Sequence, residues 1–276
     1  MHNLKPYDGD AYSLYKDALE RKDDGDTKSR LLAVNVTIEA YYKEFDKLFQ
    51  DNTLRTIPAE RIKGSLWKDL YDMYGFDAYI VKQVKSWLKE NNPVTVYAIC
   101  QFCGLAQFDT MDHILPHKKY VEYSVHARNL IPCCTDCNRQ KQEREVLNLY
   151  TDILPEVEYL FMDVIPNGDT IDFLFKLNNA QALVPAVLFS KIENHYSKLG
   201  LFEKMYNQSV SQLTRFVVQI NSQYNNQGKE AVVASVNEEI AGLRSAYGYN
   251  CWEAVFKKGL VSSPIFWDYY EKGMLE

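Results

Sequence analysis

Long apolar runs are missing from this sequence. No stretch approaches the roughly 18 consecutive apolar residues that a membrane-spanning helix needs, and the segment from Met1 to Pro6 contains no apolar signal-peptide core. Glycine and proline are also scarce, with 12 and 9 among 276 residues, which argues against a disordered, collagen-like or low-complexity chain. Because 46% of the residues are hydrophobic, most of the chain has enough apolar surface to fold. We therefore expect a folded, cytoplasmic protein without a membrane segment.

The sequence also lacks a surplus of positive charge, since its formal net charge is −6 at pH 7. The acidic excess lies after residue 145, whereas residues 97–145 contain equal numbers of basic and acidic residues. If the protein binds nucleic acid, the binding surface must be a local patch, or a partner must supply the affinity.

Hydrophobic periodicity predicts a mainly α protein with a small α+β core. Amphipathic helices are expected over residues 29–49, 59–74 and 77–90, with Gly75 separating the last two. Residues 94–98 alternate between apolar and polar types, which favours an extended segment.

The C-terminal half is expected to begin with a β-hairpin. Asn167-Gly168 is typical of a hairpin turn, and the apolar stretches 158–164 and 170–175 lie on either side of it. Helical periodicity then resumes at Ala186 and is expected to end at Gly200. The chain would therefore have a helical N-terminal region (1–92), a core (93–148), and the hairpin followed by a helical C-terminal domain (149–276).

Five of the six cysteines lie within one short stretch. Clustering of this kind in a reducing compartment favours metal binding over disulfides. Two Cys-x-x-Cys pairs, Cys100/Cys103 and Cys134/Cys137, could hold one structural Zn²⁺ in a closed tetrahedral site. Cys133 is an alternative to Cys134, but only Cys134 forms a Cys-x-x-Cys pair with Cys137. The isolated Cys251 is expected to be a buried thiol.

The insert between the cysteine pairs contains the residues that suggest an enzyme. It includes DHILP at 112–116 and NLIP at 129–132, and it leads into CTDCNRQK at 134–141. This order resembles the HNH (His-Me finger) endonucleases, in particular the zinc-knuckle branch in which Asn is the third signature residue and to which phage endonuclease VII belongs. The resemblance covers only the stretch from Cys100 to Lys141.

The resemblance implies a ββα-metal core with the zinc knuckle attached to it. Asp112 and His113 would lie on the first strand, and Asn138 would open the helix. His113 would be the general base, Asp112 and Asn138 would hold one Mg²⁺ or Mn²⁺, and Asn129 would pin the loop that orients His113.

The chemistry of the residues is compatible with these roles. Hydrolysis of a phosphodiester needs an activated water molecule and a cation near the phosphate, and a neutral histidine can accept the proton. Carboxylate and amide oxygens suit a hard divalent ion. His117, Arg139 and Lys141 are candidate phosphate contacts. We interpret His126 as an exposed loop histidine.

The sequence therefore predicts a metal-dependent endonuclease that hydrolyses DNA. An alternative is a catalytically inactive zinc-knuckle module for nucleic-acid binding or assembly. The helical flanks and the acidic C-terminal half also suggest a protein-docking role, and the family resemblance suggests the effector of a bacterial anti-phage (antiviral defence) system with an ATPase partner. A homodimer is expected if both strands are cut.

Overall fold

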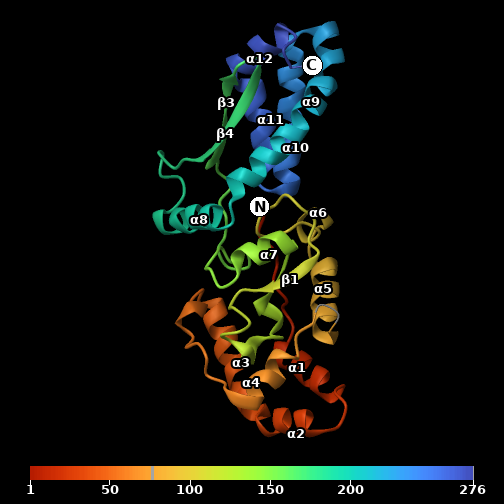
Figure 1. Ribbon diagram of the computed structural model, residues 1–276, viewed down its shortest axis with the longest axis vertical. Helices are drawn as coiled ribbons and strands as arrows, with labels where there is room; N and C mark the ends of the chain where they lie inside the picture. The colour runs from red at the N-terminus through yellow and green to blue at the C-terminus, as the bar shows by residue number, and fades with distance from the viewer. Residues whose placement is uncertain (76–77, 276) are drawn as a thin grey trace. The chain divides into compact units, whose positions relative to one another are not determined.

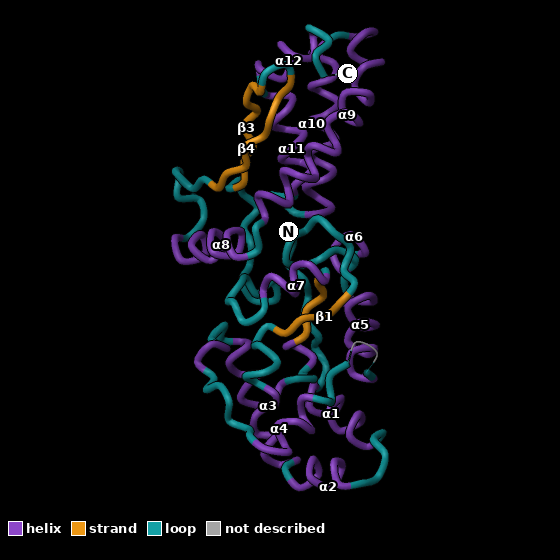
Figure 2. Tube along the Cα trace, in the orientation of Figure 1, coloured by secondary structure: helices purple, strands orange, loops and turns teal. Residues whose placement is uncertain are grey.

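The computed structural model describes residues 1–75 and 78–275, and the chain divides into two compact units. The N-terminal unit consists of residues 3–102 and 106–153, and the C-terminal unit consists of residues 154–276 together with 1–2 and 103–105. Figure 1 traces the chain, and Figure 2 shows that helices predominate over strands in both units. The mainly α fold expected from the sequence is confirmed. The boundary expected at residue 92 lies inside the N-terminal unit, so the division into three regions stays a prediction.

The N-terminal unit surrounds one short antiparallel sheet with helices. Its strands are β1 (Thr110–His113) and β2 (Leu130–Cys133). Its helices are α1 (Ala11–Glu20), α2 (Asp26–Ala33), α3 (Asn35–Gln50), α4 (Gly64–Tyr71), α5 (Tyr79–Asn91), α6 (Val94–Tyr97) and α7 (Thr135–Lys141). Short 3₁₀ turns cover Leu54–Thr56, Val121–Tyr123 and Ala127–Asn129.

Two of the expected N-terminal helices differ in extent from the prediction. The helix expected over 29–49 is interrupted at Val34, whose φ of −103° and ψ of 5° separate α2 from α3. The helix expected over 59–74 is limited to α4, because Lys63 is in an extended conformation at its N-terminus. The helix expected from Asp77 corresponds to α5, although Asp77 itself lies outside the described residues.

The prediction of an extended segment over residues 94–98 is wrong. These residues form the single helical turn α6, in which the amides of Val96 and Tyr97 both donate to the carbonyl of Pro93, at 2.9 and 3.0 Å. An alternation over so few residues does not distinguish a strand from a helical turn.

The buried face of α3 lies in the core of the N-terminal unit, and His126 packs against it. Ile38, Tyr42 and Phe45 are all at most 1% exposed. The fully buried imidazole of His126 lies 4.0 Å from the ring of Phe45, and its Nε2 is 3.2 Å from Asp46 Oδ1. The interpretation of His126 as an exposed loop histidine is therefore wrong, because this side chain is part of the core.

Replacing His126 with Gln should reduce the loss of stability on acidification. Burial lowers the pKa of His126 in the folded chain, whereas the same histidine in the unfolded chain has a pKa of about 6.5. As the pH falls, the unfolded chain therefore binds the proton first. Stability then decreases below about pH 6.5, by up to about 1.4 kcal/mol per pH unit for one histidine. Thermal unfolding at about pH 7 and pH 5 measures the effect. The same pH dependence in both proteins would contradict it.

The C-terminal unit packs long helices against a β-hairpin. The strands β3 (Leu160–Asn167) and β4 (Thr170–Leu177) pair in register from Leu160↔Leu177 to Asn167↔Thr170. The helices are α8 (Ala186–Lys198), α9 (Leu201–Gln227), α10 (Lys229–Tyr247), α11 (Trp252–Ser262) and α12 (Pro264–Glu271). Both α11 and α12 contact β3, and α9 contacts β4.

Two glycines in this unit behave as the sequence predicts. Gly168 has a φ of 59° in the hairpin turn, and Gly200 has a φ of 58° after the end of α8. Both angles lie in the left-handed region, which glycine adopts without steric cost. Cys251 is 5% exposed, so the expectation of a buried thiol is confirmed.

Candidate functional site

The strands β1 and β2 and the helix α7 bring the residues of the sequence motif together. In the antiparallel pair, Asp112 lies opposite Ile131 and His113 lies opposite Leu130. The helix α7 packs against β1, and Asp109, just before β1, accepts hydrogen bonds from the amide and hydroxyl of Thr135 at 2.7 and 3.0 Å. Residues far apart in the sequence are thereby held on one small frame.

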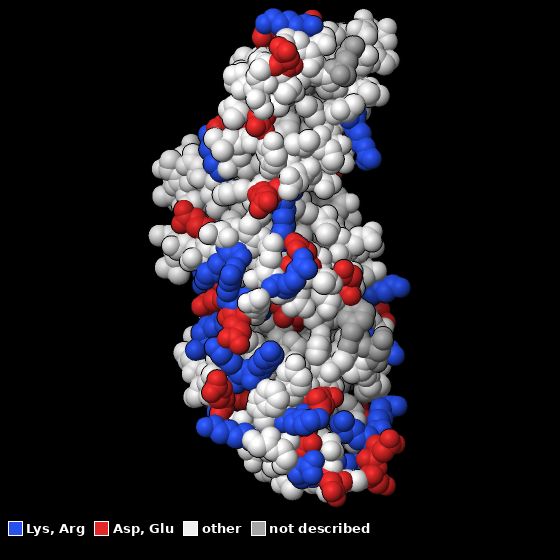
Figure 3. Space-filling model, viewed as in Figure 1, with Lys and Arg blue, Asp and Glu red and all other residues white. Residues whose placement is uncertain are grey.

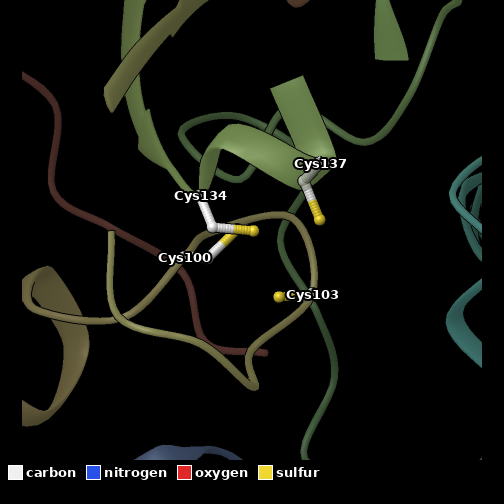
Figure 4. Close-up of side chains that lie close together, drawn as sticks. All are labelled: Cys100, Cys103, Cys134 and Cys137. Atoms are coloured by element: carbon white, nitrogen blue, oxygen red, sulfur yellow. The ribbon is translucent and has the colours of Figure 1, made fainter. Parts of the chain in front are cut away.

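The four predicted cysteines form a cluster. The Sγ atoms of Cys100, Cys103, Cys134 and Cys137 lie within 4.8 Å of one another, and all four residues are buried (Figure 4). A tetrahedral Zn²⁺ with Zn–S bonds of about 2.3 Å requires sulfur–sulfur distances of about 3.8 Å. The cluster therefore fits a zinc ion with small adjustments of the side chains.

Cys133 is not part of this cluster. It ends β2, is fully buried, and lies directly before Cys134 in the chain. Burial raises the pKa of the Cys133 thiol well above its usual range, with the nearby Asp112 carboxylate as a further cause.

Serine substitutions should separate the two neighbouring cysteines. Cys134→Ser removes one of four thiolates and should produce a protein that loses zinc to a mild chelator. The matched variant Cys133→Ser should retain about one zinc per chain, because its thiol lies outside the cluster. Mass-spectrometric metal analysis of the purified proteins measures both contents. Loss of zinc from the Cys133→Ser protein together with retention by the Cys134→Ser protein would reverse the ligand assignment.

Asp112 and His113 lie at the end of β1 and are almost completely buried, at 8% and 3% exposed. Asp112 Oδ1 accepts a hydrogen bond from the His113 amide at 2.7 Å. The other carboxylate oxygen, Oδ2, forms an ion pair with Lys141 Nζ at 3.0 Å and accepts no hydrogen bond. A divalent cation bound to this oxygen would lie beside the Lys141 ammonium.

His113 is held as a neutral imidazole. Its Nε2 lies 2.8 Å from the carbonyl oxygen of Ser124, and because a carbonyl can only accept, Nε2 carries the proton and Nδ1 keeps the lone pair. Burial lowers the pKa of His113 to about 4, a shift that the Ser124 carbonyl opposes and the Lys141 charge reinforces. A neutral imidazole with a fixed tautomer is the form that can accept a proton.

Asn129 fixes the loop that carries Ser124. Its Oδ1 accepts from the Leu115 amide at 2.8 Å, and its Nδ2 donates to the carbonyls of Leu115 and Tyr123 at 3.3 and 3.1 Å. Asn129 is completely buried. Asn129, at the end of the loop between β1 and β2, is thereby bonded to Leu115 at the start of that loop and to Tyr123, the residue before Ser124.

Lys141 differs from the expectation of a phosphate contact. Its side chain is 1% exposed, and Nζ donates to the carbonyl of His113 at 2.8 Å while lying beside Asp112. An ammonium group held in this way bonds to the protein backbone and is hidden from solvent. Lys141 therefore does not face an external phosphate in this structure, contrary to the expectation.

Asn138 and Arg139 lie on α7. The helix begins at Thr135 with Cys134 as its N-cap, so Asn138 lies one turn inside the helix. The resemblance had implied that Asn138 opens the helix, and it does not. Asn138 is half-buried. Arg139 is 76% exposed and pairs with Asp136 at 3.1 Å, so its guanidinium can reach an external anion.

Two rings contact His113: Tyr74, which the sequence analysis had not selected, and His117, which it had selected as a candidate phosphate contact. The ring of Tyr74 meets the imidazole edge-on at 4.4 Å, and its hydroxyl donates to the carbonyl of Met111. The half-buried ring of His117 stacks on His113 at 4.5 Å, and burial lowers the pKa of His117 to about 3. Tyr74 lies just beyond α4, and no local pattern relates it to a motif that follows much later in the chain.

Comparisons with known proteins agree with the position of the site. Residues 100–144 match the family model described as HNH endonuclease. A segment of 40 residues is 50% identical to protein ea31 of Escherichia phage lambda, and the match covers 14% of this chain and 14% of ea31. No solved structure matches. These findings support a domain of the HNH endonuclease family at residues 100–144, and the family match leaves the flanking regions uncovered.

Within residues 1–75 and 78–275, no helix combines the length and the apolar character that a membrane crossing requires.

Proposed function

We propose that this chain is a metal-dependent endonuclease that hydrolyses phosphodiester bonds in DNA, with β1, β2 and α7 as the ββα-metal core of the HNH type. The observation that supports it best is the pairing of a neutral, oriented His113 with the Asp112 carboxylate on the same strand. The family match over residues 100–144 covers all of these residues.

His113 is the general base in this proposal. Its Nδ1 lone pair takes a proton from a water molecule, and the water oxygen attacks the phosphorus while the bond to the 3′ oxygen breaks; the 3′ oxygen leaves with the bonding electrons and takes up a proton from solvent. The products are a 5′-phosphate and a 3′-hydroxyl end. The Ser124 carbonyl, which holds Nε2–H, keeps the lone pair directed and stabilises the imidazolium that forms.

Asp112 and Asn138 would hold the catalytic Mg²⁺ or Mn²⁺ through their side-chain oxygens. The Oδ2 atom of Asp112, which accepts no hydrogen bond, suits a hard cation, and that cation would stabilise the charge that develops at the phosphate. Lys141 keeps Asp112 in place from the protein side. His117 and Arg139 remain the candidate contacts to the phosphate, and Asn129 keeps the loop closed.

Zinc has a different role in this proposal. Cys134 and Cys137 lie at the start of α7, the helix that also carries Asn138. A zinc ion bound there fixes the helix and thus the position of a catalytic ligand, without taking part in hydrolysis.

His113→Ala should abolish Mg²⁺-dependent nicking of a supercoiled plasmid, because loss of a general base typically costs about 100-fold or more in rate. The zinc content and the unfolding temperature should stay close to those of the wild type, which separates lost catalysis from lost folding. His2→Ala serves as the matched histidine control, and EDTA should stop cleavage by the wild type.

Two results would contradict the nuclease assignment. One is undiminished cleavage by His113→Ala, and the other is a wild-type protein that shifts DNA without cutting it in Mg²⁺ or Mn²⁺. The second result would favour the inactive zinc-knuckle binding module.

We propose further that the protein is a cytoplasmic, regulated effector of anti-phage defence with an ATPase partner, and that it acts as a homodimer when both strands are cut. The acidic excess after residue 145 supports docking to a protein rather than to DNA for that part of the chain. Purified protein that cuts DNA vigorously and with sequence specificity on its own would contradict a regulated role.

A further inference from the structure

Four aromatic rings form a continuous stack that ends on His113. Trp67 and Tyr71 of α4 stack at 4.8 Å with an interplanar angle of 13°, and Tyr71 stacks on His117 at 4.1 Å and 4°. His117 in turn stacks on His113 at 4.5 Å and 11°. We refer to Trp67, Tyr71, His117 and His113 as the ring column.

Hydrogen bonds fix the orientation of the rings. The indole Nε1 of Trp67 donates to the carbonyl of Lys118 at 3.1 Å, and His113 Nε2 lies 2.8 Å from the carbonyl oxygen of Ser124. The hydroxyl of Ser124 donates to the carbonyl of Leu70 at 2.7 Å, which ties α4 to the loop that orients His113. The column is therefore a rigid platform whose ordering has already been completed on folding.

Phe45 and Phe49 stack at 19° in the core of the same unit, whereas the rings around His126 pack at larger angles. His126 packs against Tyr42 and Phe45 at angles of 48° and 33°, and Phe45 packs against Tyr123 at 55°. These rings around His126 are almost completely buried. Within the column the planes are nearly parallel, and the outer rings of Trp67 and Tyr71 are only half-buried. Parallel rings that extend from a buried site toward solvent are the geometry on which nucleobases stack.

Positive charge lies beside the outer end of the column. Lys63, immediately before α4, and Lys118, whose carbonyl holds the Trp67 indole, are both exposed. In Figure 3, basic side chains are numerous over the N-terminal unit and sparser over the C-terminal unit on the face that is drawn. An aromatic platform flanked by lysines is the combination that binds a single strand by its bases and its phosphates.

We propose that Trp67, at the end of the ring column away from His113, stacks on an unpaired nucleobase of the substrate, so that the protein binds single-stranded nucleic acid in preference to duplex. The inference rests on the proposed nuclease function, because His113 supplies the reacting end of the column. In a duplex the faces of the bases are covered by their neighbours, whereas an unpaired base offers a free face.

Binding without added Mg²⁺ tests the inference apart from cleavage. The zinc-loaded full-length protein is titrated onto fluorescently labelled oligo-dT and onto a duplex of equal length, and anisotropy is followed. Trp67→Ala should weaken oligo-dT binding about tenfold, as expected for the loss of one base-stacking ring, and Trp67→Phe should retain most of the affinity. Duplex binding should be weaker than oligo-dT binding in the wild type and unchanged by both substitutions.

Trp87→Ala is the matched control. Trp87 is half-buried on α5 of the same unit, under Lys5 and edge-on to Tyr7, and it is not part of the ring column. This variant should bind oligo-dT as the wild type does. If Trp67→Ala fails to fold, quenching of tryptophan fluorescence by oligo-dT replaces it, and the quenching should be lost in Trp67→Phe and kept in Trp87→Phe.

Several results would overturn the inference. Folded Trp67→Ala could bind oligo-dT as tightly as the wild type, or oligo-dT could fail to quench the tryptophan fluorescence of the wild type. Trp87→Ala could lose as much affinity for oligo-dT as Trp67→Ala, or the wild type could bind duplex more tightly than oligo-dT. Faster cleavage by Trp67→Ala with unchanged binding would also overturn it, because α4 would then act as a cover. Trp67-dependent binding without any cleavage in Mg²⁺ would contradict the nuclease proposal and leave the base-stacking site in place.

Discussion

The pairing of β1 with β2 is the constraint on which the candidate site depends. It is an antiparallel match of four residues on each strand, and such a ribbon is only marginally stable without support. The support comes at the open end of the ribbon, where Thr110 lies opposite Cys133, because Cys100 and Cys103 precede β1, Cys134 and Cys137 follow β2, and the four sulfur atoms lie close together. A zinc ion at that point would close the frame and hold the register that places Asp112 and His113 beside α7.

The loop between the two strands gives the site its chemistry. Asn129 ties the beginning of this loop to its end through three buried hydrogen bonds, and the neighbouring Ser124 carbonyl determines which nitrogen of His113 carries the proton. Helix α4 adds a second support through Ser124. The N-terminal helices are therefore more than a separate flank, since one of them takes part in orienting the proposed base.

The sequence predicted the parts of the site whose spacing along the chain is short and regular. The two Cys-x-x-Cys pairs follow from local chemistry, as does the hairpin turn at Gly168 outside the site, whereas the strand that carries Asp112 was implied by the family resemblance. The break at Val34 and the helical turn after Pro93 could not be recognised, because hydrophobic periodicity does not register a change of direction within a helix or distinguish short elements. The burial of Lys141 and the stacking of Tyr71 on His117 depend on contacts between distant segments, which no local pattern contains.

The central claim is that two metals have separate places, a structural zinc on sulfur and a catalytic cation on oxygen beside His113. Crystallography of the His113→Ala protein with bound oligonucleotide and Mn²⁺ tests it most directly, with anomalous data collected at the zinc and manganese edges. The account predicts a zinc peak among Cys100, Cys103, Cys134 and Cys137, and a manganese peak in contact with Asp112, Asn138 and a phosphate oxygen. A manganese peak away from Asp112, or no zinc peak at the cysteines, would contradict it.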